Sequence, residues 1–419
     1  MNPLHVVIDA RLFGGQSGGI EQVVIGLASS LSSLDDGDER YTFLAYPKSH
    51  DWIQPYISGR ATMLLTTAVV PPPRWKRALR ENLPGYTRIA ETTSLLAGKR
   101  TISIPQSDGT IERLGADVIH FPIQRAFLTN VPSIYHPHDL LYRHLPHLLP
   151  AYERLKRETT YRRFCDQAKV VSVTSTWIKQ DLVRQFELPP QKIAVVPLSP
   201  VTGCYATPRT SDIDATAARF SLPEAYVFYP ARTWPHKNHL KLLEALALIR
   251  DRDNLIIPCV CSGGHDKFFA TIRQRIRELH LENQVQFPGH VSPLELRCLY
   301  ARARCVVVPT LFEAASGPVG EAFATGTAVA CSNVTSLPAQ SGSGALLFDP
   351  HDANDIAHAI RRLWTDESLR QTLIACGRDQ IARLTWPQTA RHFRALYRQL
   401  AKRPLTDEDR HLLTTPPLL

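Results

Sequence analysis

The stretch of sequence that says most about the architecture is residues 305–337, which read CVVVPTLFEAASGPVGEAFATGTAVACSNVTSL. The apolar run Cys305–Val308 is typical of a strand buried on both faces. Pro318 and Gly326 bracket a short helix, because proline favours the first helical position and glycine the residue just past the last turn. A second apolar run follows, so the stretch predicts strand, loop, helix and strand of a parallel α/β sheet.

Two carboxylates, Glu313 and Glu321, flank the predicted loop, with Glu321 expected in the first helical turn. Loops of this kind lie at the carboxyl ends of parallel strands, where ligands bind and where unpaired helix N–H groups favour anions. A carboxylate accepts two hydrogen bonds from a vicinal diol, so the pair suits a ligand with two diols, such as a nucleotide sugar. The helix dipole alone also favours a glutamate at Glu321, which leaves a structural role open.

The pattern Glu313-x7-Glu321, followed by Ser332 and the run Ser336-Leu337-Pro338, resembles the donor-site signature of retaining glycosyltransferases of family 4. The resemblance implies the GT-B fold, in which two Rossmann-like domains with parallel sheets face each other across a cleft. One departure is that the usual Glu-Gly-Phe-Gly reads EAAS over residues 313–316. Small residues still permit close backbone approach, but the family's contacts at the two alanines are not carried over.

The chain of 419 residues is long enough for two cores, since single cores stop growing at about 250 to 300 residues. A Pro, Thr, Ser and Asp-rich stretch without periodicity marks a linker between them. With the family's arrangement, we expect an acceptor domain over 1–200, a linker over 201–222, a donor domain over 223–385, a helix over 386–403 that crosses back to the first domain, and a frayed tail over 404–419.

Composition limits the classes of partner. The net charge of +9 predicts an anionic partner, namely a nucleotide donor, an acidic membrane surface or nucleic acid. Nucleic acid is disfavoured, because the cations do not cluster beside aromatic residues in a recognisable module. No apolar run approaches the ~18 residues of a membrane span, and the first 15 residues lack the pattern of a signal peptide. We therefore expect a cytoplasmic protein.

Metal binding is not expected. The eight cysteines contain no Cys-x-x-Cys pair and mostly sit in apolar runs, which is typical of buried thiols. Asp212-Ile213-Asp214 has the form of a metal-binding Asp-x-Asp but falls in the predicted linker, so we interpret it as a solvated acid pair.

The chain begins with a predicted strand, His5–Asp9, and a glycine-rich turn that leads into a helix. The glycine spacing is not that of a dinucleotide-binding fingerprint. In the resembled family a Gly-Gly at this turn touches the donor phosphates, which carries over to Gly18 and Gly19.

A strand over residues 133–136 ends in a polar tip that contains His138 and Asp139. A histidine at the carboxyl end of a strand can reach a bound sugar, and in the family a histidine here contacts the donor sugar. The alternative is that His138 is an ordinary hydrogen-bonded residue.

The second domain opens with a strand and the loop PARTWPHKN over residues 230–238, which again feeds a helix. Arg232 offers a two-pronged guanidinium and Lys237 a point charge, a pair that suits a diphosphate. In the family the matching Arg-x4-Lys grips the donor diphosphate. A solvated basic loop is the alternative.

The resemblance implies the remaining site residues. The turn that contains Gly289, His290 and Val291 is expected near the nucleotide base, and Ser316, Gly317 and Pro318 belong to the donor loop. His138, Arg232, Lys237 and Glu313 form the expected catalytic set. No cofactor or metal is expected beyond the nucleotide diphosphate sugar itself.

The sequence thus predicts a retaining, metal-independent glycosyltransferase that moves a hexose to a glycan or lipid-linked acceptor. GDP-mannose is the first candidate donor, because residues 229–238 resemble the matching segment of bacterial polysaccharide mannosyltransferases. A nucleotide-sugar epimerase of similar fold is the nearest alternative. A glycoside hydrolase would not need Arg232 and Lys237. A non-enzymatic anion or nucleic-acid binder is the remaining alternative.

Residues 47–115 have no clear pattern apart from a basic segment, in which Arg74, Lys76, Arg77 and Arg80 surround Trp75. Such a segment suits the headgroup region of an anionic membrane, or else a solvated helix face. It predicts peripheral association with the inner face of the membrane.

Overall fold

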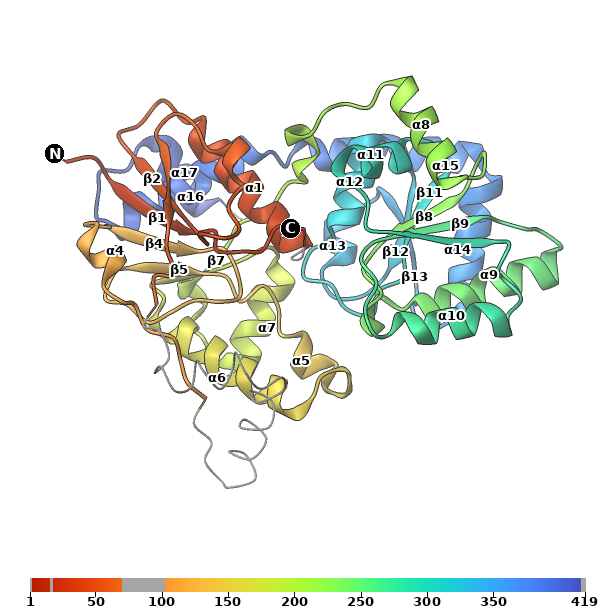
Figure 1. The fold of residues 1–419 in the computed structure, drawn as a ribbon, viewed down its shortest axis with the longest axis horizontal. Helices are drawn as coiled ribbons and strands as arrows, with labels where there is room; N and C mark the ends of the chain where they lie inside the picture. The colour runs from red at the N-terminus through yellow and green to blue at the C-terminus, as the bar shows by residue number, and fades with distance from the viewer. Residues whose placement is uncertain (1, 16–17, 70–101, 416–419) are drawn as a thin grey trace. The chain divides into compact units, whose positions relative to one another are not determined.

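The computed structural model describes residues 2–15, 18–69 and 102–415, and they divide into two compact units (Figure 1). Unit 1 contains the chain up to Val173, Lys179–Val196 and the residues from Ala390 on. Unit 2 contains Thr174–Ile178 and Pro197–Thr389. Each unit is built on one parallel sheet, which confirms the predicted fold class of two Rossmann-like domains.

The described strands of unit 1 form a seven-stranded parallel sheet in the order β3-β2-β1-β4-β5-β6-β7. β1 lies between β2 and β4 and is buried along its whole length, with Val7 opposite Thr42 on one side and Ile119 on the other. Its continuous apolar run is the pattern expected for a strand covered on both faces. The strands are β1 (His5–Asp9), β2 (Arg40–Ala45), β3 (Ala61–Leu65), β4 (Val118–Phe121), β5 (Ser133–Tyr135), β6 (Val170–Val173) and β7 (Ile193–Val195).

Helices cover this sheet through apolar faces. α1 buries Val23, Val24, Leu27 and Leu31, a spacing that places them on one face of the helix. The helices of this part of the chain are α1 (Gly19–Ser32), α4 (Thr110–Arg113), α5 (Leu141–His144), α6 (Ala151–Gln167) and α7 (Thr176–Phe186). The chain returns to unit 1 within α16 (Trp386–Leu400) and ends its described part after α17 (Asp407–Thr414).

The described strands of unit 2 form a six-stranded parallel sheet in the order β10-β9-β8-β11-β12-β13. The order reverses between β8 and β11, and the loops after these two strands therefore lie side by side at the carboxyl edge. Ligands bind at such a point in open α/β sheets. The strands are β8 (Val227–Pro230), β9 (Cys259–Ser262), β10 (Val285–Gly289), β11 (Cys305–Val308), β12 (Val329–Ser332) and β13 (Ala345–Phe348).

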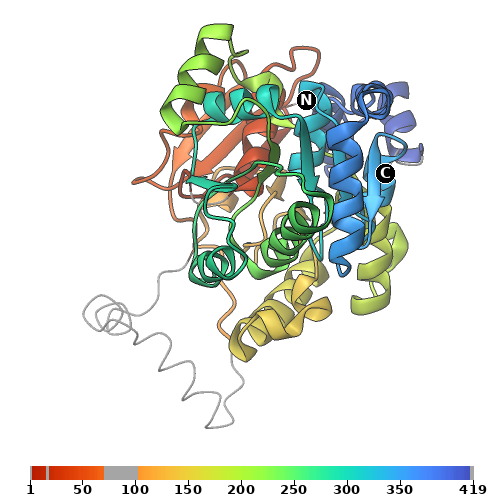
Figure 2. The ribbon, with the colours of Figure 1, turned by 90° about the vertical axis from the view of Figure 1, so that its right-hand side faces the viewer.

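The helices of unit 2 form two layers. α9 packs against α10 and α14, and α12 packs against α11 and α15 (Figures 1 and 2). The helices are α8 (Thr210–Phe220), α9 (His239–Asp253), α10 (Phe269–Glu278), α11 (Pro293–Arg302), α12 (Gly317–Thr325), α13 (Leu337–Ser341), α14 (Ala353–Thr365) and α15 (Glu367–Ala382). A core of aliphatic and aromatic side chains fills the space between the helices and the sheet.

Two expectations about the organisation of the chain were wrong. The predicted linker over 201–222 contains α8, which packs against α11 and begins where the Asp212 carboxylate accepts a hydrogen bond from the Arg209 N–H at 2.9 Å. The predicted frayed tail contains α17, whose Asp409 is buried. Within the patternless residues 47–115, β3 and α4 are regular elements. α8 and α17 are polar, and the hydrogen bonds that begin them are not revealed by hydrophobic period, whereas β3 is held by its pairing with β2.

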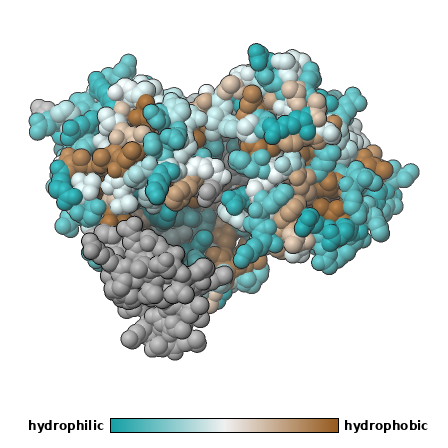
Figure 3. All heavy atoms as spheres, viewed as in Figure 1, coloured by the Kyte–Doolittle hydropathy of each residue, from teal (hydrophilic) through white to brown (hydrophobic). Residues whose placement is uncertain are grey.

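On the face shown in Figure 3, apolar patches are small and are interspersed with hydrophilic residues in both units. Within the described part of the chain, no helix is both long enough and apolar enough to cross a membrane. The cysteines are all free thiols, and six of the eight are buried, as predicted. The basic segment around Trp75 lies outside the described residues.

Candidate functional site

The loop after β8 carries the first pair of predicted site residues, and the structure joins one of them to a carboxylate of the loop after β11. The Lys237 ammonium forms an ion pair with Oε1 of Glu313. Both side chains are largely buried, with 16% and 12% of their surface exposed. The two residues are 76 positions apart in sequence, and their pairing places the predicted phosphate cation beside the predicted sugar carboxylate.

Hydrogen bonds lock these two loops together. The carbonyl oxygen of His236 accepts from the Leu311 N–H at 2.8 Å, and the hydroxyl of Tyr229 donates to the Lys237 carbonyl at 2.8 Å. Asn238 adopts a left-handed conformation with φ of 61°, and its amide donates to the carbonyls of Pro309 and Pro350 at 2.9 and 2.8 Å. Asparagine tolerates this conformation better than most residues, which explains its place here. The backbone of Lys237 is therefore held from both sides.

Arg232 lies on the opposite flank of the loop, towards β9. Its guanidinium carbon is 5.1 Å from the ring centre of Trp234, within range of a cation–π interaction. A side chain on Gly263 would meet the carbonyl oxygen of Ala231 at 2.4 Å, and one on Gly264 would lie 3.8 Å from the Arg232 guanidinium. The glycines after β9 thus let the two loops approach closely.

The EAAS segment is fastened by side chains that the sequence analysis did not single out. The Thr335 hydroxyl accepts from the Glu313 N–H at 3.1 Å and donates to the Glu313 carbonyl at 2.6 Å. The Gln340 amide both accepts from the N–H and donates to the carbonyl of Ser316, each at 2.8 Å. These bonds span more than 20 residues, so no local pattern could have predicted them. They fix the backbone at both ends of the segment.

The N-terminus of α12 follows this segment. Ser316 is the N-cap residue, Gly317 the first helical residue and Pro318 the second, one position later than predicted. The Ser316 hydroxyl oxygen is buried and has no hydrogen-bond partner among the described residues. Unpaired N–H groups of a first helical turn attract anions, so this end of α12 is suited to phosphate oxygens.

Glu321 lies in the second turn of α12, not in the first as expected, because the helix begins at Gly317. The helix dipole acts mainly within the first turn, so it is a weaker explanation for this glutamate than the sequence suggested. Its Oε2 accepts a hydrogen bond of 2.6 Å from the Tyr300 hydroxyl. Burial raises the pKa of the Glu321 carboxyl, and the hydrogen bond from Tyr300 works in the opposite direction.

The turn predicted to lie near the base occupies the end of β10. Gly289 has a positive φ of 78°, which favours glycine, and its carbonyl accepts from the Gly263 N–H at 2.7 Å. His290 is exposed and Val291 is buried. β9 and β8 separate β10 from β11 in the sheet, so this turn is set apart from the Lys237–Glu313 pair along the same carboxyl edge.

Unit 1 holds the other predicted residues, and each lies where its element was expected. Gly18 is the N-cap residue of α1 with φ of 55°, and Gly19 begins the helix. A side chain on either glycine would meet no atom of the described residues within 4 Å, so close packing against them does not explain these glycines. The positive φ of Gly18, a conformation that favours glycine, explains the glycine at that position.

His138 follows β5 and has a positive φ of 63°, which is uncommon for a residue with a side chain. Its Nε2 lies 2.9 Å from the Pro122 carbonyl oxygen. Because a carbonyl only accepts, Nε2 carries the proton and Nδ1 is left as an acceptor. Burial lowers the pKa of His138, so the ring is neutral near pH 7.

Two further histidines lie beneath His138. Nε2 of His120 is 2.7 Å from Nε2 of His136, and Nδ1 of His120 is 2.6 Å from the Tyr397 hydroxyl on α16. The rings of His136 and His138 are 5.7 Å apart. Burial lowers the pKa of His120 to about 3 and lowers that of His136 as well. The functional end of β4 and β5 is thus held by a neutral network that reaches α16.

Comparison with known families agrees with this arrangement. The profile described as Glycosyltransferase Family 4 matches residues 17–198, and the profile described as Glycosyl transferases group 1 matches residues 213–380. The chain belongs to the family 4 glycosyltransferases. This confirms the resemblance drawn from Glu313 and Glu321.

Two members with similar sequences show how this family 4 glycosyltransferase compares with known proteins. It is 27% identical over 250 residues to the O-antigen chain mannosyltransferase B of Escherichia coli, a match that spans 59% of this chain and 65% of that protein. It is 28% identical over 290 residues to a D-inositol 3-phosphate glycosyltransferase of Corynebacterium glutamicum, over 64% of this chain and 69% of that protein. The matches therefore cover about two thirds of the relatives' length.

Solved structures confirm the GT-B fold. The structure of Anabaena HepE in complex with UDP and glucose superposes with a TM-score of 0.67 at 16% identity, over 94% of this chain and all of that one. At this level of identity the similarity shows only that the two chains share a fold.

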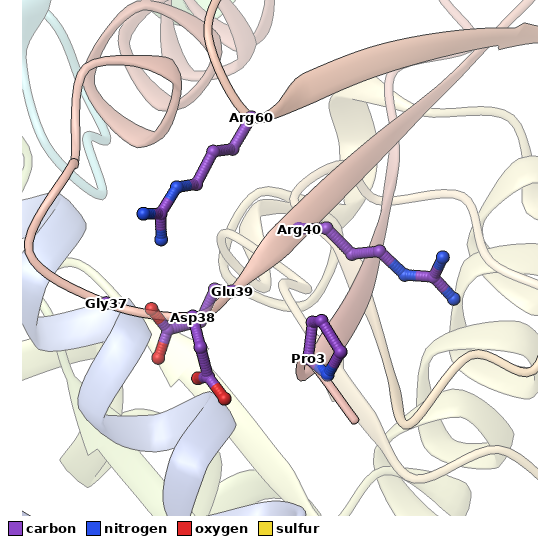
Figure 4. A pocket seen from close by; sticks show the side chains of 6 residues that line it. All are labelled: Pro3, Gly37, Asp38, Glu39, Arg40 and Arg60. Atoms are coloured by element: carbon purple, nitrogen blue, oxygen red, sulfur yellow. The ribbon is translucent and has the colours of Figure 1, made fainter. Parts of the chain in front are cut away.

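Two other features of this glycosyltransferase lie away from the described site. A pocket of about 430 Å³ lies where β1, β2 and β3 begin, at the opposite edge of the sheet from the ligand-binding ends (Figure 4). It is lined by Pro3, Gly37, Asp38, Glu39, Arg40 and Arg60. Within the described ranges, no cluster of three or more His, Cys, Asp or Glu side chains could hold a metal ion. The Asp212 carboxylate accepts from the N–H and the guanidinium of Arg209 at the start of α8.

Proposed function

We propose that this protein is a retaining glycosyltransferase that moves mannose from GDP-mannose to a glycan or lipid-linked acceptor in the synthesis of a polysaccharide or glycoconjugate. The observation that carries the proposal is the pairing of Lys237 with Glu313 beside the N-terminus of α12. It joins a phosphate-binding cation, a sugar-binding carboxylate and a helix end suited to anions at one edge of one sheet.

The diphosphate is bound by charge. Arg232 and Lys237 contact the phosphate oxygens, and the N–H groups that follow Ser316 donate to them. Lys237 pairs with Glu313, and the bound diphosphate takes the place of this carboxylate as the anionic partner of Lys237. Positive groups placed where negative charge develops on the leaving diphosphate lower the barrier, a task that a metal ion performs in other transferases.

The two glutamates and His138 orient the donor. Glu313, released from Lys237, accepts hydrogen bonds from the sugar hydroxyls, and Glu321 accepts them from the ribose. His138 presents Nδ1 as an acceptor to a sugar hydroxyl. The backbone of Gly289, His290 and Val291 reads the base, and Gly18 and Gly19 let the chain approach the phosphates.

The reaction keeps the configuration of the sugar. The bond between sugar C1 and the phosphate oxygen breaks, and the acceptor oxygen bonds to C1 on the same face. The acceptor's proton passes to the departing phosphate oxygen, so the step requires no protein base.

The relatives support two acceptor classes. Similarity to an O-antigen mannosyltransferase supports a growing glycan or lipid-linked sugar, which fits action at the cytoplasmic face of a membrane. Similarity to D-inositol 3-phosphate glycosyltransferases supports a small polyol phosphate as the second candidate. An epimerase of similar fold would form product without any acceptor.

The experiment begins with a thermal-shift screen of GDP, UDP and ADP, followed by turnover of GDP-mannose and UDP-glucose with a mannosyl glycolipid or inositol 3-phosphate. We expect GDP to stabilise most, by about 2.7 kcal/mol at 100 times its Kd. We expect turnover only with an acceptor, undiminished in EDTA, and an NMR spectrum with the donor's anomeric configuration. Activity lost in EDTA and restored by Mg²⁺, or an inverted product, would refute the mechanism.

A further inference from the structure

Tyr300 is a buried residue of α11 that contacts one of the two key glutamates. Its side chain is 1% exposed, and its ring packs edge-on against Phe228 with 5.0 Å between ring centres. Its carbonyl oxygen accepts from the Thr327 hydroxyl at 3.0 Å. The packed ring and the anchored backbone therefore fix the position of the Tyr300 hydroxyl. This hydroxyl donates to Oε2 of Glu321 at 2.6 Å.

This hydrogen bond distinguishes the two oxygens of the Glu321 carboxylate. Oε2 is directed to Tyr300, whereas Oε1 lies 3.6 Å from the point that a side chain on Gly317 would occupy. Gly317 is exposed and opens α12. Oε1 is thus placed at the accessible first turn of the helix, where the absence of a side chain leaves room for a ligand.

We propose that Tyr300 is a positioning residue that presents Glu321 to the vicinal hydroxyl pair of the donor's ribose. The inference rests on the proposed function, since it names the group that prepares one of its binding residues. Tyr300 itself does not touch the ligand. It holds the carboxylate in one orientation and favours its ionised form, so that both ribose hydroxyls find an acceptor.

The electrostatics of the site agree with this geometry. Burial raises the pKa of Glu321, and the bond from Tyr300 opposes that effect. A carboxylate in an apolar setting needs such a donor to remain charged. Burial, and next the nearby Glu321 charge, raise the pKa of Tyr300, so the phenol keeps its proton and remains a donor.

A thermodynamic cycle tests the proposal. Wild-type protein and Tyr300→Phe are titrated calorimetrically with GDP and UDP and with their 2′,3′-dideoxy counterparts. We expect the wild type to prefer the ribonucleotide by roughly ten-fold or more, because the dideoxy form lacks both donors to Glu321. Tyr300→Phe should lose roughly ten-fold in affinity for the ribonucleotide and little for the dideoxy form. The preference for ribose should then shrink accordingly.

Tyr226→Phe is the matched control. Tyr226 is also buried and also packs on Phe228, but its hydroxyl donates to the Leu299 carbonyl at 2.9 Å and not to a carboxylate. It should leave the ribose preference intact. A Tyr300→Phe variant that keeps the full preference, or that loses both nucleotides equally, would overturn the positioning role alone. A wild type that binds no nucleoside diphosphate would overturn the proposed function and this inference with it.

Discussion

At the level of single residues, Lys237 is the charge on which the proposed chemistry depends most directly. Its ammonium is held against Glu313 by two loops whose backbones are hydrogen-bonded to each other, so its position is set before any ligand arrives. In the proposed mechanism the ammonium keeps its place when phosphate replaces Glu313 as its partner, which limits the cost of rearrangement.

Lys237→Ala is expected to lower kcat/KM for the donor by ten- to 150-fold, because one charge-assisted contact of ~1.5 to 3 kcal/mol is lost. Steady-state kinetics with varied donor measure the effect. Lys241→Ala is the control, since Lys241 pairs with Glu244 on α9 with both side chains about one third exposed. Full turnover by Lys237→Ala with an unchanged melting temperature would remove this lysine from the site.

The residues that could be predicted from sequence are those whose chemistry shows in a local pattern. Lys237 and Glu313 each sit in a loop between an apolar run and a helix, and the structure brings the two together. Tyr300 and Gln340 could not be found this way, because their significance lies in hydrogen bonds to Glu321 and Ser316, 21 and 24 residues away. A tyrosine in an amphipathic helix looks like any other core residue until its partner is known.

At the level of whole elements, the helices that could be predicted are those whose own sequence carries a hydrophobic pattern. Helices with an apolar face, such as α1 and α9, follow the predicted period. α8 and α17 are polar. A carboxylate in the first turn accepts from the N-cap N–H in both of them, from Arg209 in α8 and from Thr406 in α17. α17 is further held by Arg398 of α16, whose guanidinium donates to Glu39 at 2.6 Å and to Asp409 at 2.9 Å. The contacts of Arg398 lie within unit 1.

Arg398→Met should destabilise unit 1 by about 3 to 5 kcal/mol, because it leaves two buried carboxylates without their cation. Glu39 and Asp409 are 3% and 1% exposed, so water cannot replace the guanidinium. The unfolding midpoint in urea measures the loss. Arg410→Met is the matched control on α17, where an exposed pair with Asp407 should contribute less than about 1 kcal/mol. Equal midpoints for the two variants would contradict a stabilising role for the buried triad.

At the level of the whole molecule, buried histidines make stability depend on pH. Burial lowers the pKa of His120 and of His239 to about 3 and that of His392 to about 4. In the unfolded chain these rings take up a proton near pH 6.5. Below that pH the unfolded state binds more protons than the folded state, so stability falls as pH falls towards the folded pKa. Above about pH 7 both states are neutral, and the penalty vanishes.

His239→Phe isolates one such contribution. The His239 ring packs on Tyr229 with 4.9 Å between ring centres, and neither of its nitrogens has a hydrogen-bond partner among the described residues. Phenylalanine preserves the packing and removes the titration, so the variant should match or exceed the wild type at pH 7. At pH 5 it should gain a further ~2 kcal/mol relative to the wild type, the linkage energy of one histidine held neutral 1.5 units below its unfolded pKa. Melting temperatures of both proteins, measured from pH 7.5 to 5, test this directly. A difference between them that stays constant with pH would mean that His239 is protonated in the folded protein, or that its burial is relieved before unfolding.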